Sequence, residues 1–154
     1  MTNDDTGARF RLARCGCDGQ PLEPLGPLPQ AVLEINQTAA DFYHHASYQP
    51  PWVGYLAVDG QTVVGAGGFV GAPEANRVEI AYFTLPEQER KGYATRTAAA
   101  LVAIARAALP GVEVYAKTAP EDGPSPAVLT HLGFRRIGTV IDHEIGLAWA
   151  WLLA

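Results

Sequence analysis

The sequence has no apolar run long enough to span a bilayer. The longest, IGLAWAWLLA at the C-terminal end, is about half the ~20 residues that a membrane-spanning helix needs, and it favours a buried final strand over a tail anchor. The N-terminal stretch MTNDDTGARF has neither the basic segment nor the apolar core of a secretory signal. These absences predict a cytoplasmic protein without a membrane partner.

Positively charged residues are also few. The chain carries 11 Lys and Arg against 16 Asp and Glu, a net charge of −5. A nucleic-acid-binding surface normally has a surplus of cations, so we expect no nucleic-acid partner, whereas a cationic small substrate fits the charge. With 154 residues, 48% of them hydrophobic and 18% charged, the composition predicts one globular domain spanning residues 1–154.

Cysteine is nearly absent. Cys15 and Cys17 are separated by one residue, which is too close for an unstrained disulfide. They could supply half of a metal site, but no second pair of ligands follows at zinc-finger spacing. We therefore expect no metal and interpret both as turn residues, with any further role left open.

Hydrophobic periodicity predicts the secondary structure. Alternating or apolar segments indicate strands, period-3.6 segments indicate helices, and Asp59-Gly60 is a strong hairpin signal. The resulting order is β-α-β-β-β-α-β-α-β-β. It predicts an α/β fold with a mixed, mostly antiparallel central sheet of six to seven strands and helices on both faces. The strands are expected over 8–15, the two halves of 52–70, 77–85, 111–117, 134–141 and 147–153, and the helices over 31–46, 93–109 and about 127–131.

Each of the two longer expected helices has an apolar stripe. In the first, the stripe consists of Val32, Ile35, Ala39 and Phe42. In the second it consists of small and aliphatic residues, which would let the helix lie close to a sheet: Ala98, Leu101, Ile104, Ala105 and Ala108.

The second of these helices begins on positive charge. Arg90 and Lys91 precede Gly92, although the N-terminus of a helix already carries partial positive charge from its free N–H groups. Such amides, with a glycine that allows close approach, can bind a phosphate or pyrophosphate, and Arg96 could add charge. The alternative is a solvated basic helix start. A P-loop is excluded because G-x-x-x-x-G-K-[ST] does not occur.

Two segments resemble the GCN5-related N-acetyltransferases. EIAYFTLPEQERKGYAT (79–95) is similar to the acetyl-CoA motif of that family, whose loop runs Gln/Arg-x-x-Gly-x-Gly/Ala. SPAVLTHLGFRRIG (125–138) is similar to its Ser-x-x-x-Leu-x-x-Leu-Gly-Phe segment. The resemblance covers roughly residues 50–141, and the architecture is closest to the branch that acetylates protein N-termini, ribosomal ones included. Two positions depart from the family pattern, Glu89 in place of Gln or Arg and Asp122 in place of Asn.

The resemblance implies a coenzyme site. The strand at 79–85 would splay from the parallel strand at 111–117, and the arm of acetyl-CoA would lie in the gap, paired with backbone groups of Phe83 and Leu85. The coenzyme-binding residues would be Phe83, Thr84, Leu85, Glu89, Arg90, Lys91, Gly92, Tyr93, Ala94, Thr95 and Ser125.

The resemblance also implies catalytic roles. The Phe83 N–H would stabilise the oxyanion that forms when an amine attacks the thioester. Glu79 would be the general base, the alternative being a surface ion pair with Arg77 or Arg136. Many relatives protonate the leaving thiolate with a tyrosine, but Leu129 stands at that position. Ser125 would take this role, unless it is the N-cap of its helix. Tyr93, Tyr82 and Tyr115 are further alternatives.

The acceptor amine is not identified by the sequence. His44 and His45 would border its pocket or belong to a solvated helix face, and Asp142, His143 and Glu144 would frame the same pocket or form a polar turn. Trp149 and Trp151 share a face and fit core or dimer packing, and the apolar final strand suggests a homodimer. The expected function is direct acetyl transfer to a primary amine. A catalytically inactive CoA-binding regulatory module and a structural domain that binds nothing are the alternatives.

Overall fold

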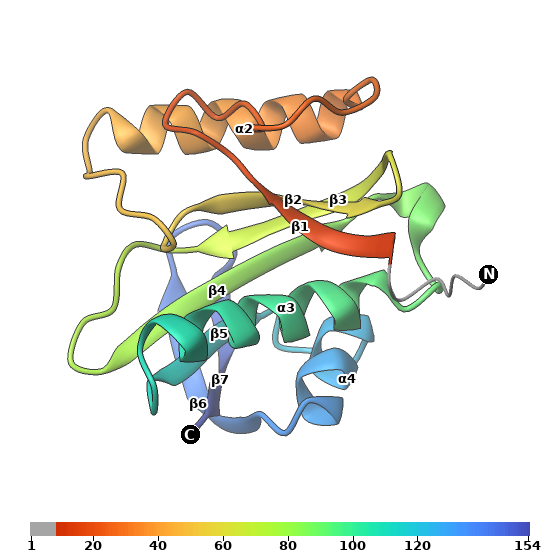
Figure 1. The fold of residues 1–154 in the computed structure, drawn as a ribbon. Helices are drawn as coiled ribbons and strands as arrows, with labels where there is room; N and C mark the ends of the chain where they lie inside the picture. The colour runs from red at the N-terminus through yellow and green to blue at the C-terminus, as the bar shows by residue number, and fades with distance from the viewer. Residues whose placement is uncertain (1–8) are drawn as a thin grey trace.

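The computed structural model describes residues 9–154, and its strands form one mixed sheet with helices on both faces (Figure 1). Helix α2 covers one face, and α3 and α4 lie on the other. Residues 1–8 lie outside the described part, and with them the first residue of the expected first strand and most of the N-terminal stretch MTNDDTGARF. Over residues 9–154, no helix is both long and apolar enough to cross a membrane.

The elements follow the expected order, with small changes in their bounds. They are β1 (Phe10–Arg14), α2 (Gln30–Tyr43), β2 (Gly54–Asp59), β3 (Thr62–Phe69), β4 (Arg77–Thr84), η1 (Pro86–Gln88), α3 (Tyr93–Ala108), β5 (Glu113–Thr118), α4 (Pro124–His131), β6 (Arg135–Asp142) and β7 (Gly146–Leu153). Helix α4 begins earlier than the expected Ala127, because Pro124 fits the first turn of a helix, where no N–H is needed.

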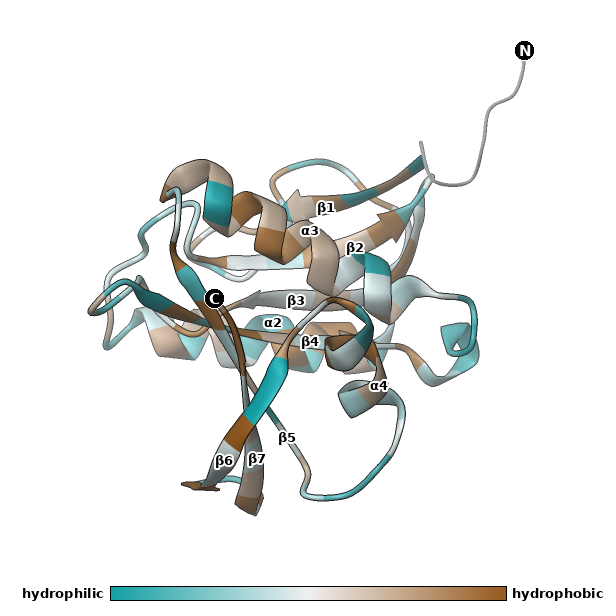
Figure 2. Cartoon of the chain, turned by 90° about the horizontal axis from the view of Figure 1, so that it is seen from below, coloured by the Kyte–Doolittle hydropathy of each residue, from teal (hydrophilic) through white to brown (hydrophobic). Residues whose placement is uncertain are grey.

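The sheet is antiparallel except at one pair. Its order is β1-β2-β3-β4-β5-β7-β6, and only β4 and β5 run parallel. These two strands pair at three positions, from Arg77 opposite Glu113 to Glu79 opposite Tyr115. Beyond Glu79 they diverge, and Figure 2 shows β5 turning away from β4. The expected splayed pair is therefore confirmed.

Two apolar clusters hold the helices on the sheet. The cluster under α3 and α4 includes Val78, Ile80 and Leu101, and the cluster under α2 includes Val32 and Leu56; all five are at most 2% exposed. Burial of this kind contributes about 1.5–3 kcal/mol for each large aliphatic side chain. Strand β4 contributes to both clusters, so both faces of the strand beside the split are anchored.

The helices are rotated slightly from their expected faces. On α3, Thr97 is buried and Ala108 is exposed, because the last turn of the helix runs past the buried stripe. On α2, Asn36 is buried, whereas Phe42 is 44% exposed. The neighbouring Tyr43 turns to the core instead and packs edge-on against Tyr48.

The tryptophans of β7 belong to the core. Trp151 is 6% exposed and donates its indole N–H to the Thr118 hydroxyl over 3.0 Å. Trp149 packs against the same cluster, and the Arg136 guanidinium lies 3.9 Å from the centre of its ring.

Candidate functional site

The turn before α3 presents a row of free backbone amides. Arg90 and Gly92 have positive φ angles of 68° and 85°, and the helix begins at Tyr93 without a side-chain cap. The first helical bond runs from the Arg96 N–H to the Gly92 carbonyl. Within residues 9–154, the amides of 90–95 have no backbone or side-chain acceptor. Such amides form a nest for an anion.

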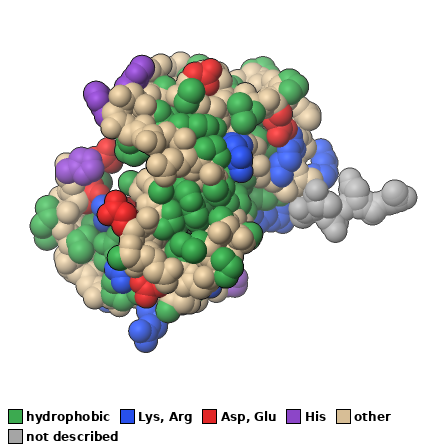
Figure 3. Space-filling view, turned by 60° about the vertical axis from the view of Figure 1, so that its left-hand side comes forward, with side chains coloured by type: hydrophobic (Ala, Val, Ile, Leu, Met, Phe, Trp, Pro, Cys, Tyr) green, Lys and Arg blue, Asp and Glu red, His purple; other side chains and the backbone are tan. Residues whose placement is uncertain are grey.

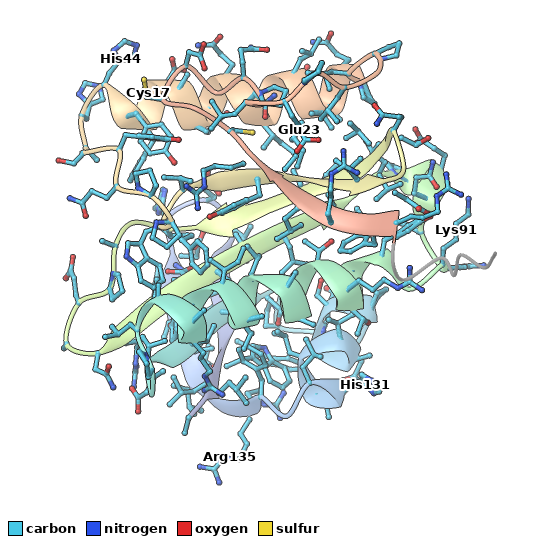
Figure 4. The ribbon with its side chains drawn as sticks, viewed as in Figure 1. Cys17, Glu23, His44, Lys91, His131 and Arg135 are labelled. Atoms are coloured by element: carbon cyan, nitrogen blue, oxygen red, sulfur yellow. The ribbon has the colours of Figure 1, made fainter. Side chains whose placement is uncertain are left out.

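The nest is open to an incoming ligand. A Cβ added at Gly92 would meet no atom within 4 Å, so the space above the glycine is clear. Arg90 and Lys91 are exposed beside it, and Lys91 donates to the Gln88 side chain over 3.1 Å. Figure 4 shows Lys91 at the end of the molecule where α3 begins. The residues present therefore fit a diphosphate, with cations at its rim.

The side chain of Tyr93 is used by the fold. Its hydroxyl donates to the Asp59 carboxylate, and its ring stacks on Phe10 at 6.1 Å. The contact with Asp59 is the main reason that the pKa of Tyr93 lies above its ordinary value. Among the groups of Tyr93, the amide is therefore the one available to a ligand.

Hydrogen bonding to β3 decides which backbone groups of β4 face the split. In an antiparallel pair, alternate residues direct both N–H and C=O to the partner strand. The Glu79 carbonyl accepts from Val70, and the Leu85 N–H donates to Val64, both over 2.9 Å. The register between these bonds has no shift. The odd-numbered residues of β4 therefore face β3, and Tyr82 and Thr84 face the split.

This alternation, in which the odd-numbered residues of β4 direct their backbone groups to β3, corrects two expectations. The Phe83 N–H was expected to meet the thioester, but Phe83 lies opposite Ala66 in the same phase as Leu85 and is directed at β3. The Leu85 amide is already bonded to Val64 and cannot pair with the coenzyme arm. The backbone groups of Tyr82 and Thr84 face the split instead, and Tyr82 is the nearer of the two to the point where the strands part. The sequence analysis missed the Tyr82 amide because alternation gives the faces of a strand, but not which neighbour its amides meet.

Glu79 is part of a cluster of three charges. Its carboxylate lies 3.6 Å from the Lys117 ammonium, which lies 2.8 Å from the carboxylate of Asp142. The three side chains are 14–24% exposed and come from β4, β5 and the end of β6. The suggested ion pairs of Glu79 with Arg77 or Arg136 do not form, because Arg77 pairs with Glu113 and Arg136 stacks on Trp149.

The cluster shifts all three pKa values. Burial raises the pKa of Glu79 above the ordinary carboxyl value, and the charge of Lys117 opposes this rise. The contact with Asp142 raises the pKa of Lys117. Lys117 and the amides of Glu144 and Ile145 lower the pKa of Asp142 to about 2. Glu79 is thus the carboxyl group of the cluster that is easiest to protonate.

The sheet surface beside Glu79 is open. Ala81, the next residue on the same face of β4, is exposed, since α2 covers other strands of the sheet. Figure 3 brings the left-hand side of Figure 1 forward and shows a hollow with acidic and basic side chains in its wall and histidine at its edge. A substrate could therefore reach Glu79 from the α2 side.

His44 and His45, which follow α2, are not brought into the charge cluster. The helix ends at Tyr43, and His44 and His45 follow it as exposed residues. Figure 4 shows His44 pointing outward at the end of α2. Of the polar turn 142–144, Asp142 belongs to the cluster, whereas His143 and Glu144 are exposed.

Ser125 lies in the first turn of α4 and is not its N-cap. The cap position is Gly123, and Ser125 is an exposed residue. One helical turn later, Leu129 is fully buried at the position where relatives carry tyrosine. The Ser125 hydroxyl is thus accessible, and within residues 9–154 no hydrogen bond orients it.

Tyr82 has a second feature that sequence reasoning did not find. Its side chain points to the α3 side, and its hydroxyl is buried without a hydrogen-bond partner in the described part of the chain. Burial raises the pKa of this hydroxyl to about 12, so it is a neutral donor at physiological pH. A buried donor without an acceptor is unfavourable, so this hydroxyl is a candidate for a contact with a bound ligand or water.

The cysteines do not form a metal site with other described residues. Cys15 is buried and Cys17 is exposed, and both are free thiols. Burial raises the pKa of Cys15 to about 11, so it is an unreactive core thiol. Within 9–154, no three His, Cys, Asp or Glu side chains are grouped as metal ligands.

Comparisons with known proteins are consistent with this geometry. Residues 13–135 match the family model described as an acetyltransferase (GNAT) domain. No curated protein matches the sequence.

Solved structures share the fold at low identity. A GNAT-family acetyltransferase from Bacillus anthracis is 20% identical, with a TM-score of 0.60 over 77% of this chain and 74% of that one. RimJ from Mycobacterium smegmatis, solved with CoA-disulfide, is 20% identical, with a TM-score of 0.65 over 85% and 68%. A mutant of the spermidine N-acetyltransferase SpeG from Vibrio cholerae is 12% identical, with a TM-score of 0.68 over 95% and 94%.

Proposed function

The chain belongs to the GNAT acetyltransferases, and from this we propose that it is an acetyl-CoA-dependent N-acetyltransferase acting by direct transfer to a primary amine. One observation carries the proposal. A free amide nest at 90–95, a strand edge with free amides and a half-buried carboxylate lie in succession along the split between β4 and β5.

The coenzyme would be bound mainly by backbone groups. The amides of the nest would hold the diphosphate, with Arg90 and Lys91 at its rim. Glu89 is exposed and its side chain cannot donate to phosphate, which a clamp made of amides tolerates. The arm would then run along the β4 edge and pair with Thr84 and Tyr82 in place of a neighbouring strand. Ser125 would border it from α4.

The Tyr82 N–H would stabilise the transition state. The amine nitrogen attacks the thioester carbonyl carbon, and the carbonyl oxygen takes up negative charge. An amide fixed in a strand costs no reorganisation as that charge develops. When the C–S bond breaks, the electron pair leaves with the coenzyme sulfur, and the nitrogen loses a proton to give the neutral amide product.

Glu79 would accept that proton, directly or through a water molecule. Its raised pKa makes it a better base than an ordinary carboxylate. How much a general base is needed depends on the acceptor amine. Deprotonating a lysine-like amine near neutral pH costs about 4–5 kcal/mol, but only about 1 kcal/mol for a peptide α-amine.

The proton for the leaving thiolate would come from Ser125 or Tyr82. Ser125 is accessible but not oriented by a hydrogen bond within residues 9–154, whereas the Tyr82 hydroxyl is buried on the α3 side of β4 without an acceptor among the same residues. The second observation favours Tyr82 as the donor to the sulfur.

The acceptor would be a small-molecule amine or the N-terminus of a peptide or protein. The ribosomal-protein branch is supported by the likeness to RimJ, and a polyamine by the likeness to SpeG. A homodimer also remains part of the proposal, because Ile141 and Leu147 on the hairpin of β6 and β7 are 75% and 56% exposed.

A catalytically inactive CoA-binding module is the second candidate. The buried Leu129 at the usual tyrosine position favours it. Two measurements separate the candidates, calorimetric titration with CoA and acetyl-CoA turnover with a panel of peptides and polyamines. Micromolar binding with turnover of at least one amine supports the enzyme. Binding without turnover supports the module, and absence of binding contradicts both.

A further inference from the structure

The cluster of Glu79, Lys117 and Asp142 contains two carboxylates and one ammonium group. The ammonium group lies closer to one carboxylate than to the other. The Lys117 nitrogen is 2.8 Å from Asp142 but 3.6 Å from Glu79, which is longer than a hydrogen bond. Asp142 is itself fixed, because it accepts the N–H groups of Glu144 and Ile145 over 2.8 and 3.2 Å. A carboxylate anchored by the β6–β7 turn therefore holds the lysine.

The geometry has a consequence for Glu79. Lys117 lies on β5 two residues beyond Tyr115, the last partner of β4, so its side chain reaches across the start of the split. At 3.6 Å it compensates the charge of Glu79 from just beyond hydrogen-bond distance. If Asp142 were absent, Glu79 would be the remaining carboxylate within reach of the ammonium, and a hydrogen bond from lysine would then weaken it as a base.

We propose that Asp142 is a positioning residue for the acetyl transfer, which draws Lys117 to itself and leaves the oxygens of Glu79 free to accept the proton of the amine. This inference rests on the proposed function, in which Glu79 is the base. The proton passes from the amine nitrogen to a Glu79 oxygen, and Lys117 and Asp142 exchange no proton in the step.

The charged and titratable groups around Glu79 are few. Lys117 and Tyr115 face it from β5, Asp142 from the end of β6, and the apolar Val70 from the β3 side. Arg77, two residues earlier on the same face of β4, is paired with Glu113 and lies over the Tyr115 ring. The Glu79 charge should therefore respond to substitutions in the cluster with little interference from other elements.

Three variants test the inference. Asp142→Asn keeps an acceptor for the two turn amides but removes the charge that holds Lys117. Lys117→Met removes the ammonium, and the double variant removes both. Glu23→Gln is the control, since it breaks the Arg11–Glu23 pair, which lies on β1 and the loop after it, outside the cluster.

The first readout is the titration of the Glu79 carboxyl by carbon NMR in glutamate-labelled protein, assigned with Glu79→Gln. We expect Asp142→Asn to lower the midpoint and Lys117→Met to raise it, each by about one pH unit. Glu23→Gln should leave it unchanged. A midpoint that stays constant in Asp142→Asn, or moves upward, overturns the inference.

The second readout is the pH profile of kcat/KM with the best amine of the panel. Asp142→Asn should lower the plateau several-fold and shift the acid limb downward, and Lys117→Met in the same chain should restore the plateau. A merely structural role for Asp142 predicts no such restoration, so a double variant as slow as Asp142→Asn contradicts the inference. If the NMR midpoints move as stated but no amine is acetylated, the preference of Lys117 for Asp142 over Glu79 is supported and the proposed function is wrong.

Discussion

The Leu85 N–H donates to the Val64 carbonyl over 2.9 Å, and this bond fixes the phase of β4. Because the Glu79 carbonyl accepts from Val70 with the same alternation, the amides of Tyr82 and Thr84 are turned to the gap where β5 diverges from β4. A chain with a one-residue shift here would present Phe83 to the gap instead.

This phase predicts opposite effects of proline at adjacent positions. Thr84→Pro removes an amide that faces the gap, so the protein should fold, and CoA affinity should fall roughly threefold to tenfold, the value of one hydrogen bond. Leu85→Pro removes the bond to Val64 at a buried position and should cost about 1–3 kcal/mol of stability. Calorimetry with CoA and urea unfolding measure the two effects, with Thr84→Ala as the control for the side chain. Equal loss of stability in both proline variants would contradict the assigned phase.

Gly92 allows a comparison between two matched glycines. Gly92 and Gly111 have φ angles of 85° and 82°, and an added Cβ would meet no atom within 4 Å at either position. Alanine at either site should therefore cost about 1–2 kcal/mol of unfolding free energy through backbone strain alone. Only Gly92→Ala should weaken CoA binding, because its methyl group enters the nest. Similar CoA affinity in the two variants would show that the diphosphate binds elsewhere.

Glu79→Gln tests the base and distinguishes acceptor classes. For an amine of the lysine type, we expect kcat/KM near neutral pH to fall by about 10²–10⁴, the usual contribution of a general base. For a peptide α-amine, the loss should be much smaller. Since burial raises the pKa of Glu79, its ionisation disfavours the folded state at neutral pH, and Glu79→Gln should not lower the melting temperature. Unchanged turnover with all amines across the pH range would remove Glu79 from the mechanism.

The ionisation of Asp142 should stabilise the folded protein, whereas that of Glu79 destabilises it. Its pKa is lowered from 3.8 to about 2 in the folded protein, so the unfolded chain binds the proton more readily. The stabilisation is therefore complete above about pH 4 and is lost as the pH falls to 2. In urea unfolding, the difference between the wild type and Asp142→Asn should shrink across this window. A constant difference between pH 2 and 6 would be inconsistent with the ion pair.

The Tyr82 hydroxyl should cost stability in the free protein. Since it is buried without an acceptor in the described residues, Tyr82→Phe should raise the unfolding free energy by about 1 kcal/mol or more. If the hydroxyl serves the leaving thiolate, the same variant should lower kcat, while Ser125→Ala should not. Thermal unfolding and steady-state rates measure both effects. A destabilised Tyr82→Phe with full activity would contradict the assignment.

Local sequence patterns predicted the helices and strands, whereas the candidate site depends on how the strands pair with one another. Asp59-Gly60 and the alternation of Val78 and Ile80 placed the hairpin and β4, and Gly92 placed the start of α3, because turn chemistry and periodicity are local properties. The free amides of Tyr82 and Thr84 could not be predicted in this way, since they depend on the register of β4 with β3.

Lys117 was missed for the same reason. Its approach to Glu79 follows from the pairing of Glu79 with Tyr115 and from the position of Asp142 at the far end of the sheet. The cap at Gly123 was missed because a glycine before two prolines competes poorly with serine as a capping signal.

The most direct test is a crystal structure of the protein with acetyl-CoA. We expect the diphosphate on the amides of 90–95 and the thioester oxygen at hydrogen-bond distance from the Tyr82 nitrogen, with Glu79 facing the carbonyl carbon from the α2 side. A thioester bonded to the Phe83 nitrogen, or a coenzyme bound outside the split between β4 and β5, would contradict the account.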